Sequence, residues 1–134
     1  MALTARSAPG LDFSRWSSDS TRLIYVVKSG KSFAAIVDGK NFGAYPSIIQ
    51  RSHCFSPDSN VAAFGATVKA ADTQNPSVGE DALVLNGKVE RTWRRDRGFG
   101  LMGGVYFSPN SQRHAYGVKK GEKSLVVIDG EAIR

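Results

Sequence analysis

A five-residue phrase that occurs three times constrains the fold of this chain more than any other feature. Residues 55–59 read Phe-Ser-Pro-Asp-Ser, residues 107–111 read Phe-Ser-Pro-Asn-Ser, and residues 16–20 read Trp-Ser-Ser-Asp-Ser. After each copy come two apolar runs separated by a polar turn, and the second run ends in Asp-Gly or Asn-Gly. The chain therefore consists of three copies of one unit built from strands and turns.

Each unit is predicted to hold four strands. The phrase turns the chain after the first strand, and the Asp-Gly or Asn-Gly pair makes a tight turn before the fourth. Apolar runs that do not alternate, such as residues 125–128, suit strands covered on both faces. The predicted strands are 52–55 and 104–107, then 22–27, 61–68 and 113–118, then 32–37, 82–85 and 124–128, and last 41–49 and 88–94. No helical periodicity competes with them, so the predicted fold class is all-β.

The residues that recur are those that build the unit. We expect the aromatic residues of the phrase to be buried between adjacent units, because they return in register just before the turn. We expect the proline, aspartate and asparagine residues to shape the turn itself. The structural repeat residues are Trp16, Asp19, Phe55, Pro57, Asp58, Phe107, Pro109 and Asn110.

A period of roughly 40 to 50 residues is typical of β-propeller blades, and a closed propeller usually has about four to eight of them. We expect one domain over residues 1–134, with repeats at about 11–50, 51–103 and 104–134. Nineteen residues separate Gly87 from Phe107, and the residues after Gly130 and before Trp16 together also number nineteen. We therefore expect a homodimer in which two chains form one six-bladed ring and residues 1–10 complete the partner's last blade. The alternative is an excerpt of a longer propeller.

The repeats resemble TolB-like, WD-repeat-like propeller blades, and they are similar to blades of propeller domains attached to prolyl-oligopeptidase-type peptidases. The resemblance rests on the Phe-Ser-Pro-Asp phrase and covers nearly the whole chain. The chain departs from the pattern at residues 16–18, which lack the proline, and at Asn86 and Asn110, which replace aspartate. The resemblance implies an architecture but no single activity, because such blades serve binding scaffolds, envelope proteins and gating domains. A peptidase centre is not implied, since no Gly-x-Ser-x-Gly sequence is present.

The densest basic segment that also carries an aromatic residue lies at residues 91–97. The formal net charge of the chain is +6, which favours polyanions or an acidic partner, although a solvated basic surface is the alternative. An indole among arginines could stack a base or hold a phosphate backbone, whereas an outer strand followed by a solvated loop would need neither. The candidate ligand or partner contacts are Arg91, Trp93, Arg94, Arg95 and Arg97.

Other motifs predict no catalytic, cofactor or metal site. Residues 98–103 match Gly-x-Gly-x-x-Gly, but they lead into a strand instead of a helix, so we expect a flexible link there. Residues 30–32 read Gly-Lys-Ser but lack the earlier glycine of a phosphate-binding loop, and we expect a hairpin turn. His53, His114 and Cys54 show no metal-ligand spacing, so structural histidines and a small buried thiol are expected.

The favoured function is a non-catalytic scaffold that binds a protein, peptide or small ligand at the ring face or channel. The alternatives are an enzyme or enzyme-gating piece, such as a hydrolase accessory, and a polyanion or nucleic-acid binder that uses residues 91–97. The long link at residues 69–81 could be a binding loop or neutral drift. The chain shows no signal peptide and no apolar stretch of ~20 residues, which predicts a cytoplasmic protein without membrane contact, or an excerpt whose signal has been removed.

Overall fold

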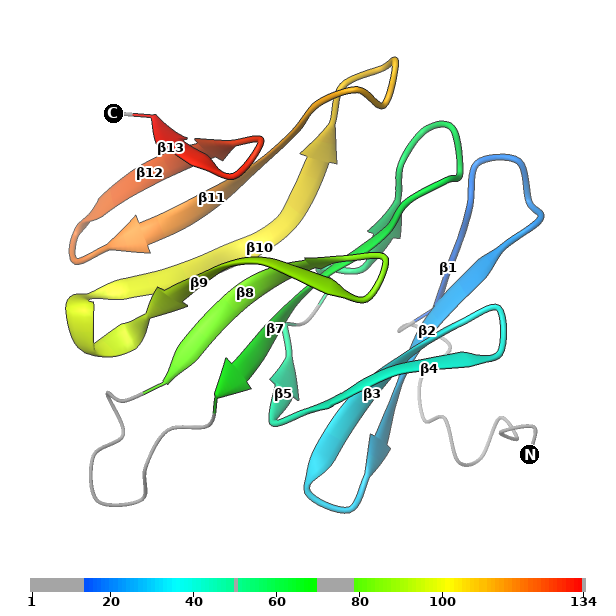
Figure 1. Ribbon diagram of the computed structural model, residues 1–134, viewed down its shortest axis with the longest axis horizontal. Helices are drawn as coiled ribbons and strands as arrows, with labels where there is room; N and C mark the ends of the chain where they lie inside the picture. Colours follow the sequence, from blue (N-terminus) through cyan, green and yellow to red (C-terminus); the bar gives the residue numbers. More distant parts are fainter. Residues whose placement is uncertain (1–13, 50, 70–78, 134) are drawn as a thin grey trace.

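The computed structural model describes residues 14–49, 51–69 and 79–133, and it places them in three antiparallel β-sheets (Figure 1). The sheets follow one another along the chain, and each takes most of its strands from one copy of the repeat unit. The described part of the chain otherwise contains one short 3₁₀ helix, η2 (Arg95–Arg97). The prediction of an all-β fold is confirmed.

The three sheets have the same strand order. Sheet 1 comprises β1 (Ser14–Trp16), β2 (Leu23–Ser29), β3 (Ser32–Val37) and β4 (Lys40–Tyr45) in that order. Sheet 2 comprises β5 (Ser47–Ile48), β7 (Ala62–Lys69), β8 (Glu80–Leu85) and β9 (Lys88–Arg94), and β6 (Cys54–Phe55) also pairs with β7. Sheet 3 comprises β10 (Phe99–Phe107), β11 (His114–Lys120), β12 (Lys123–Ile128) and β13 (Glu131–Ile133).

The repeated phrase forms the same turn in each sheet. In sheet 2, the Ser56 hydroxyl donates to Oδ1 of Asp58 at 2.7 Å and accepts the amide of Val61 at 3.0 Å. Ser59 closes the turn with a φ of 65°, in the left-handed region. The same two bonds link Ser17 to Asp19 and Arg22, and Ser108 to Asn110 and Arg113. Asparagine can replace aspartate here because its side-chain oxygen accepts the same hydrogen bonds.

The Asp-Gly and Asn-Gly pairs connect the third and fourth strands of the sheets. Both central residues have positive φ, as a two-residue hairpin turn of type I′ requires. The φ values are 51° and 82° at Asp38 and Gly39, 49° and 83° at Asn86 and Gly87, and 50° and 86° at Asp129 and Gly130. The side-chain oxygen of the first residue also accepts an amide of the second strand, from Leu23, Ala62 or His114.

Apolar side chains fill the space between successive sheets. The first interface, between sheets 1 and 2, buries Ile24, Ala35, Val37, Ala62, Phe64, Ala66 and Val84. The second interface, between sheets 2 and 3, buries Ala63, Leu83, Trp93, Val105, Tyr116, Val118 and Val127. Each interface has an aromatic pair, Tyr45 with Phe64 and Trp93 with Tyr116, whose ring centroids lie 5.6 and 6.5 Å apart. Sheet 2 is covered on both faces, which explains the unbroken burial of its strand β7 from Ala62 to Thr67.

The aromatic residues of the phrase differ in their burial. Phe55 and Phe107 are half-buried against the first and second interfaces. Trp16 is 64% exposed, so the prediction that it is buried between units is wrong. The phrase aromatic points toward the preceding sheet, and among the described residues no sheet precedes sheet 1. Residues 125–128 show the same effect at the other end, because Val126 is 51% exposed where a covered strand was expected.

Three strand predictions need correction. Residues 99–103 are not a flexible link, because β10 begins at Phe99 and bulges only between Leu101 and Val105. The predicted strand 41–49 divides, since β4 ends at Tyr45 and β5 joins the next sheet. Sheet 3 has its own fourth strand in β13, so the interpretation that the third unit lacks this strand is wrong.

Some expectations concern residues outside the described ranges. These include the exchange of residues 1–10 with a partner chain and most of the long link at residues 69–81. Where the structure describes the chain, it contains no helix with the length and apolar character needed to cross a membrane.

Candidate functional site: a basic cleft between sheets 2 and 3

A hollow whose charged lining residues are all cationic lies between the outer strands of sheets 2 and 3. It has a volume of about 600 Å³. The apolar part of its wall is formed by aromatic and aliphatic side chains, and all its charged side chains are cationic. Its lining residues are Arg91, Trp93, Phe99, Lys120, Lys123, Ser124, Leu125 and Ala132. None of them is acidic, so the cleft offers positive charge beside an apolar surface.

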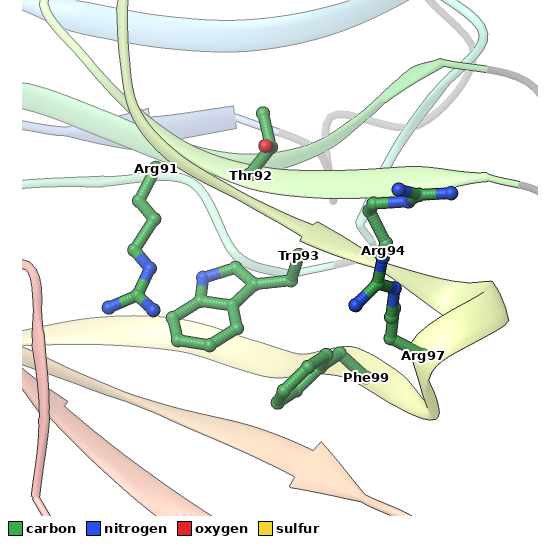
Figure 2. Close-up of a pocket in the computed structure, with 6 residues that line it drawn as sticks. All are labelled: Arg91, Thr92, Trp93, Arg94, Arg97 and Phe99. Atoms are coloured by element: carbon green, nitrogen blue, oxygen red, sulfur yellow. The ribbon is translucent and has the colours of Figure 1, made fainter.

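A smaller hollow adjoins this cleft at the end of β9. Arg91, Trp93 and Phe99 line both hollows, and Thr92, Arg94 and Arg97 complete the smaller one. Figure 2 shows the Arg91 side chain beside the indole of Trp93, with the Phe99 ring opposite and the two other arginines toward η2. The segment predicted from the sequence thus borders the cleft, but its members do different things.

Trp93 belongs to the core and is not an open stacking surface. Its side chain is 3% exposed, and its indole N–H donates to the hydroxyl of Tyr116 at 2.9 Å. The guanidinium of Arg91 lies 4.1 Å from the ring centroid, and it also donates to the carbonyl of Gly130 at 3.2 Å. In this conformation the indole has no free face for a nucleic-acid base. Arg91 remains at the cleft wall with its charge unpaired by any carboxylate in the described chain.

The next two arginines hold the local structure. Arg95 turns inward, donating to Oδ1 of Asp81 at 2.8 Å and to the Thr67 hydroxyl at 2.9 Å. Asp81 is 4% exposed, whereas the Arg95 side chain is 37% exposed, so the ion pair ties η2 to sheet 2 from the solvent side. Arg94 pairs with Asp96 across the same turn. Of the five predicted contacts, Arg91 and Arg97 are therefore the cations left without a carboxylate partner in the described ranges.

Two lysines opposite this segment were not predicted as site residues. Lys120 pairs with Phe99 across β10 and β11, and its ammonium lies 5.1 Å from the Phe99 ring centroid. Lys123 begins β12 on the other side of the same hairpin. Neither has an ion pair with a described carboxylate. The sequence of residues 119–123 predicts only a hairpin turn. These lysines come close to residues 91–97 because sheet 3 packs on sheet 2.

His114 is the residue that could have indicated catalysis. Its Nε2 lies 2.6 Å from Oε2 of Glu90, and its Nδ1 lies 3.5 Å from Oδ1 of Asp129. Both ring nitrogens thus face carboxylates, and no described hydroxyl or thiol is hydrogen-bonded to the imidazole. A histidine that activates a nucleophile must reach that nucleophile directly. The arrangement connects β9 of sheet 2 to β11 of sheet 3 and is a structural contact.

The cysteine also fits a structural role. Cys54 is partly buried, and burial raises the pKa of its thiol to about 11, so the reactive thiolate is scarce at neutral pH. His53 is buried at 2% exposure beside it. No group of three or more His, Cys, Asp or Glu side chains that could hold a metal ion occurs in the described part of the chain.

Two comparisons with known proteins found no relative of this chain. Searches against protein-family models and against curated protein sequences find no match to the chain. The functional argument therefore rests on the geometry of the cleft.

Proposed function

We propose that this chain is a non-catalytic β-propeller-type scaffold, similar to TolB-like repeats, that binds an acidic peptide segment of a partner protein in the basic cleft. The observation that carries the proposal is the cleft itself, in which Arg91, Lys120 and Lys123 line an apolar floor and no lining residue is acidic. Unpaired cations around a concave surface attract negatively charged ligands and speed their association. The proposal includes no catalytic step.

The floor of the cleft favours a peptide over a nucleic acid. Single-stranded nucleic acids are usually held by exposed aromatic rings on which the bases stack. Here Trp93 is buried, and the Phe99 ring is partly covered by Lys120. Leu125 and Ala132 add aliphatic surface, which suits a hydrophobic side chain flanked by carboxylates.

A fluorescence anisotropy titration tests this proposal. The probe is a labelled peptide with one leucine between two pairs of glutamates, and the control probe has glutamine in place of each glutamate. We expect binding of the acidic peptide that weakens as salt is raised, and at least tenfold weaker binding of the glutamine peptide. Labelled single-stranded DNA and heparin serve as competing probes.

The matched variants use two equivalent hairpins. Lys120→Glu with Lys123→Glu reverses the charge at the cleft, whereas Lys28→Glu with Lys31→Glu makes the same change at the hairpin of sheet 1. We expect the first pair to weaken peptide binding at least tenfold and the second pair to leave it nearly unchanged. Equal effects of both pairs would show that only net charge matters, and tighter binding of DNA than of the acidic peptide would also overturn the proposal.

A further inference from the structure

The smaller hollow beside the cleft lies along the edge of a strand. Four consecutive residues of β9 line it, namely Arg91, Thr92, Trp93 and Arg94. Side chains alternate between the two faces of a strand, so a hollow on one face would contact only every second residue. In Figure 2, Arg91 and Trp93 point to one side of β9, and Thr92 points to the other. The hollow, of about 260 Å³, therefore borders the backbone of β9 at its outer edge, which we call the β9 edge (residues 91–94).

The β9 edge has backbone groups that the sheet does not use. β9 is the last strand of sheet 2, and no described strand pairs with its outer side. The amide of Arg95 donates to the carbonyl of Gly79 at 2.8 Å, so these two residues form a hydrogen-bonded pair that continues the β8–β9 ladder. Because such pairs alternate along an antiparallel ladder, the backbone of Trp93 faces β8, and the N–H and C=O groups of Thr92 and Arg94 point outward. Thr92 and Arg94 thus offer about four hydrogen-bonding groups to a further strand.

The outer strands of the other two sheets offer shorter regular edges. In sheet 1, the pairing of β4 with β3 is irregular between Phe42 and Tyr45, and β4 ends at Tyr45. In sheet 2, the irregularity lies earlier, between Val89 and Arg91, and β9 then continues regularly to Arg94. The outer strand of sheet 3, β13, has three residues. Because a bulge interrupts pairing at an edge, the β9 edge is the longest regular one among these three outer strands.

The charge of the β9 edge selects the kind of strand that can pair with it. The charged residues that line its hollow are Arg91, Arg94 and Arg97. The nearby carboxylates are engaged, since Glu90 contacts His114 and Asp96 pairs with Arg94. Like charges directly opposite one another destabilise a strand pair, and opposite charges stabilise it. The β9 edge therefore repels the same edge of a second copy and favours an acidic strand.

We propose that the acidic segment of the partner protein binds as an extended strand along the β9 edge and becomes the fifth regular strand of sheet 2. The inference rests on the proposed function, because it describes how the same ligand occupies the cleft. In binding of this kind, backbone hydrogen bonds to a sheet edge supply affinity, and alternate side chains supply specificity. The added strand runs antiparallel to β9, as the described strands of sheet 2 do to their neighbours, and antiparallel pairs are slightly more stable per residue.

An added strand places every second side chain in the cleft. Peptide residues opposite Arg91 and Trp93 point the same way as these two side chains, which line the cleft together with Lys120, Lys123 and Leu125. The intervening peptide residues point away from the cleft, and their backbone groups bond to β9. A ligand with glutamate, leucine and glutamate at alternate positions therefore fits, with the leucine beside Trp93 and one glutamate beside Arg91.

Backbone methylation of a peptide tests this mode of binding. The probe is a labelled, capped seven-residue peptide with glutamate, leucine and glutamate at positions 2, 4 and 6 and threonine elsewhere, measured by fluorescence anisotropy. One version has N-methyl groups at positions 3 and 5, whose amides face β9 in the added strand, and the other has them at positions 4 and 6, whose amides face away. We expect the first version to bind at least tenfold more weakly than the unmethylated peptide and the second to stay within about threefold of it. Equal effects of the two versions would overturn the proposal.

Two proline variants make the matching test on the protein. Thr92→Pro removes an outward N–H of the β9 edge and keeps the bonds to β8, a position at which an edge strand tolerates proline. Val89→Pro does the same on the other side of the bulge, because Val89 follows the hydrogen-bonded pair Leu85–Lys88 that closes the hairpin turn. We expect Thr92→Pro to weaken binding of the unmethylated peptide at least fivefold and Val89→Pro to leave it nearly unchanged. Equal effects of the two prolines would contradict the added strand, and circular dichroism checks that both variants fold.

Amide hydrogen exchange of the wild-type chain, followed by NMR, needs no variant. The amides of Thr92 and Arg94 point outward, so we expect them to exchange quickly in the free chain and at least tenfold more slowly with saturating peptide. The amides of Arg91 and Trp93 already bond to β8 and should change much less.

The results distinguish this inference from the cleft proposal on which it rests. If the acidic peptide binds but is insensitive to methylation and leaves exchange at Thr92 and Arg94 unchanged, the added strand is wrong and the cleft proposal stands. If the acidic peptide does not bind at all, both are wrong. Loss of binding on methylation at positions 3 and 5 alone, with slower exchange at Thr92 and Arg94, is the result that we expect.

Discussion

The first and second interfaces share one apolar plan but are secured at different places. Both contain an aromatic pair and a bond between phrase turns. The first is reinforced at the turn, where Arg22 reaches Ser59 and Phe55. The second is reinforced at its outer strands, where Glu90 meets His114 and Trp93 donates to Tyr116. A repeat array can therefore keep its geometry while moving its polar contacts from one part of the interface to another.

The position of these contacts decides where a cleft can form. At the second interface, the outer strands are held by Arg91 and Trp93, which leaves the basic cleft beside them. At the first interface, Tyr45 and Phe42 fill the corresponding outer region as partly buried apolar side chains. The ring of Tyr45 also lies against Gly43, where an added Cβ would be 2.1 Å from the ring. The candidate binding site is thus tied to the interface without the turn arginine.

Removing the aromatic residue of the outer strand should give the largest difference in stability between the two interfaces. Trp93→Ala deletes a buried side chain and leaves the hydroxyl of Tyr116 without its donor, so we expect a loss of ~3–5 kcal/mol in the free energy of unfolding. Tyr45→Ala removes a half-buried ring and should cost about 2 kcal/mol. Urea unfolding measures both. Equal losses would show that the second interface does not depend on its outer strands more than the first.

The turn arginine is the matching test at the first interface. Arg22→Val installs a valine, as Val61 is at the equivalent position of sheet 2, and it removes the bonds to Ser59 and Asp38. Because the bonds are charged and the side chain is mostly covered, we expect a loss of about 1–2 kcal/mol. Arg113→Val removes an exposed residue and should change the free energy of unfolding by less than ~0.5 kcal/mol. Similar losses for the two variants would contradict the importance of the contact between sheets 1 and 2.

Transplanting the arginine contact should have a smaller effect. Val61→Arg with Asn86→Asp gives sheet 2 the Arg-Asp pair that sheets 1 and 3 have, placed where it can reach the phrase of sheet 3. We expect a gain of up to ~1 kcal/mol, since the pair would remain partly exposed. Val61→Arg alone should gain less, because Asn86 cannot anchor the guanidinium with a charge. A gain from the single change as large as that from the pair would contradict this account.

The sequence was sufficient for most of what one repeat unit determines by itself. The phrase, the Asp-Gly turns and the apolar runs predicted four strands a unit, and strand boundaries mostly agree within a few residues. Within a unit, the start of β10 at Phe99 and the strand β13 were not predicted. The other errors depend on contacts between units. Trp16 has the same local sequence context as Phe55, and its exposure follows only from the absence of a described sheet in front of it.

The candidate site shows the same division. The sequence shows a cluster of charges at residues 91–97. It does not show which of these residues pack in the core, form ion pairs or line the cleft. Arg95 turns toward Asp81 because β9 brings the end of its strand beside β8, and Trp93 is buried because sheet 3 packs on it. Lys120 and Lys123 join the site from another unit. Their contribution could have been found only by aligning the hairpin of the third unit against the outer strand of the second.

The smallest expected effect concerns the phrase itself and compares Asp58 with Asn110. The hydrogen bonds from Ser56 and the Asn60 amide lower the pKa of Asp58 in the folded protein. A lowered pKa stabilises the fold at pH values above the ordinary carboxyl pKa of about 3.9, and this contribution disappears as the pH falls through the folded pKa. Asp58→Asn should therefore destabilise slightly at pH 7 and not at all in strong acid, and Asn110→Asp should do the reverse. Melting temperatures between neutral pH and about pH 2 measure the difference. If the melting temperatures of Asp58→Asn and the wild type differ by the same amount at every pH, the charge of the Asp58 carboxylate does not stabilise the turn.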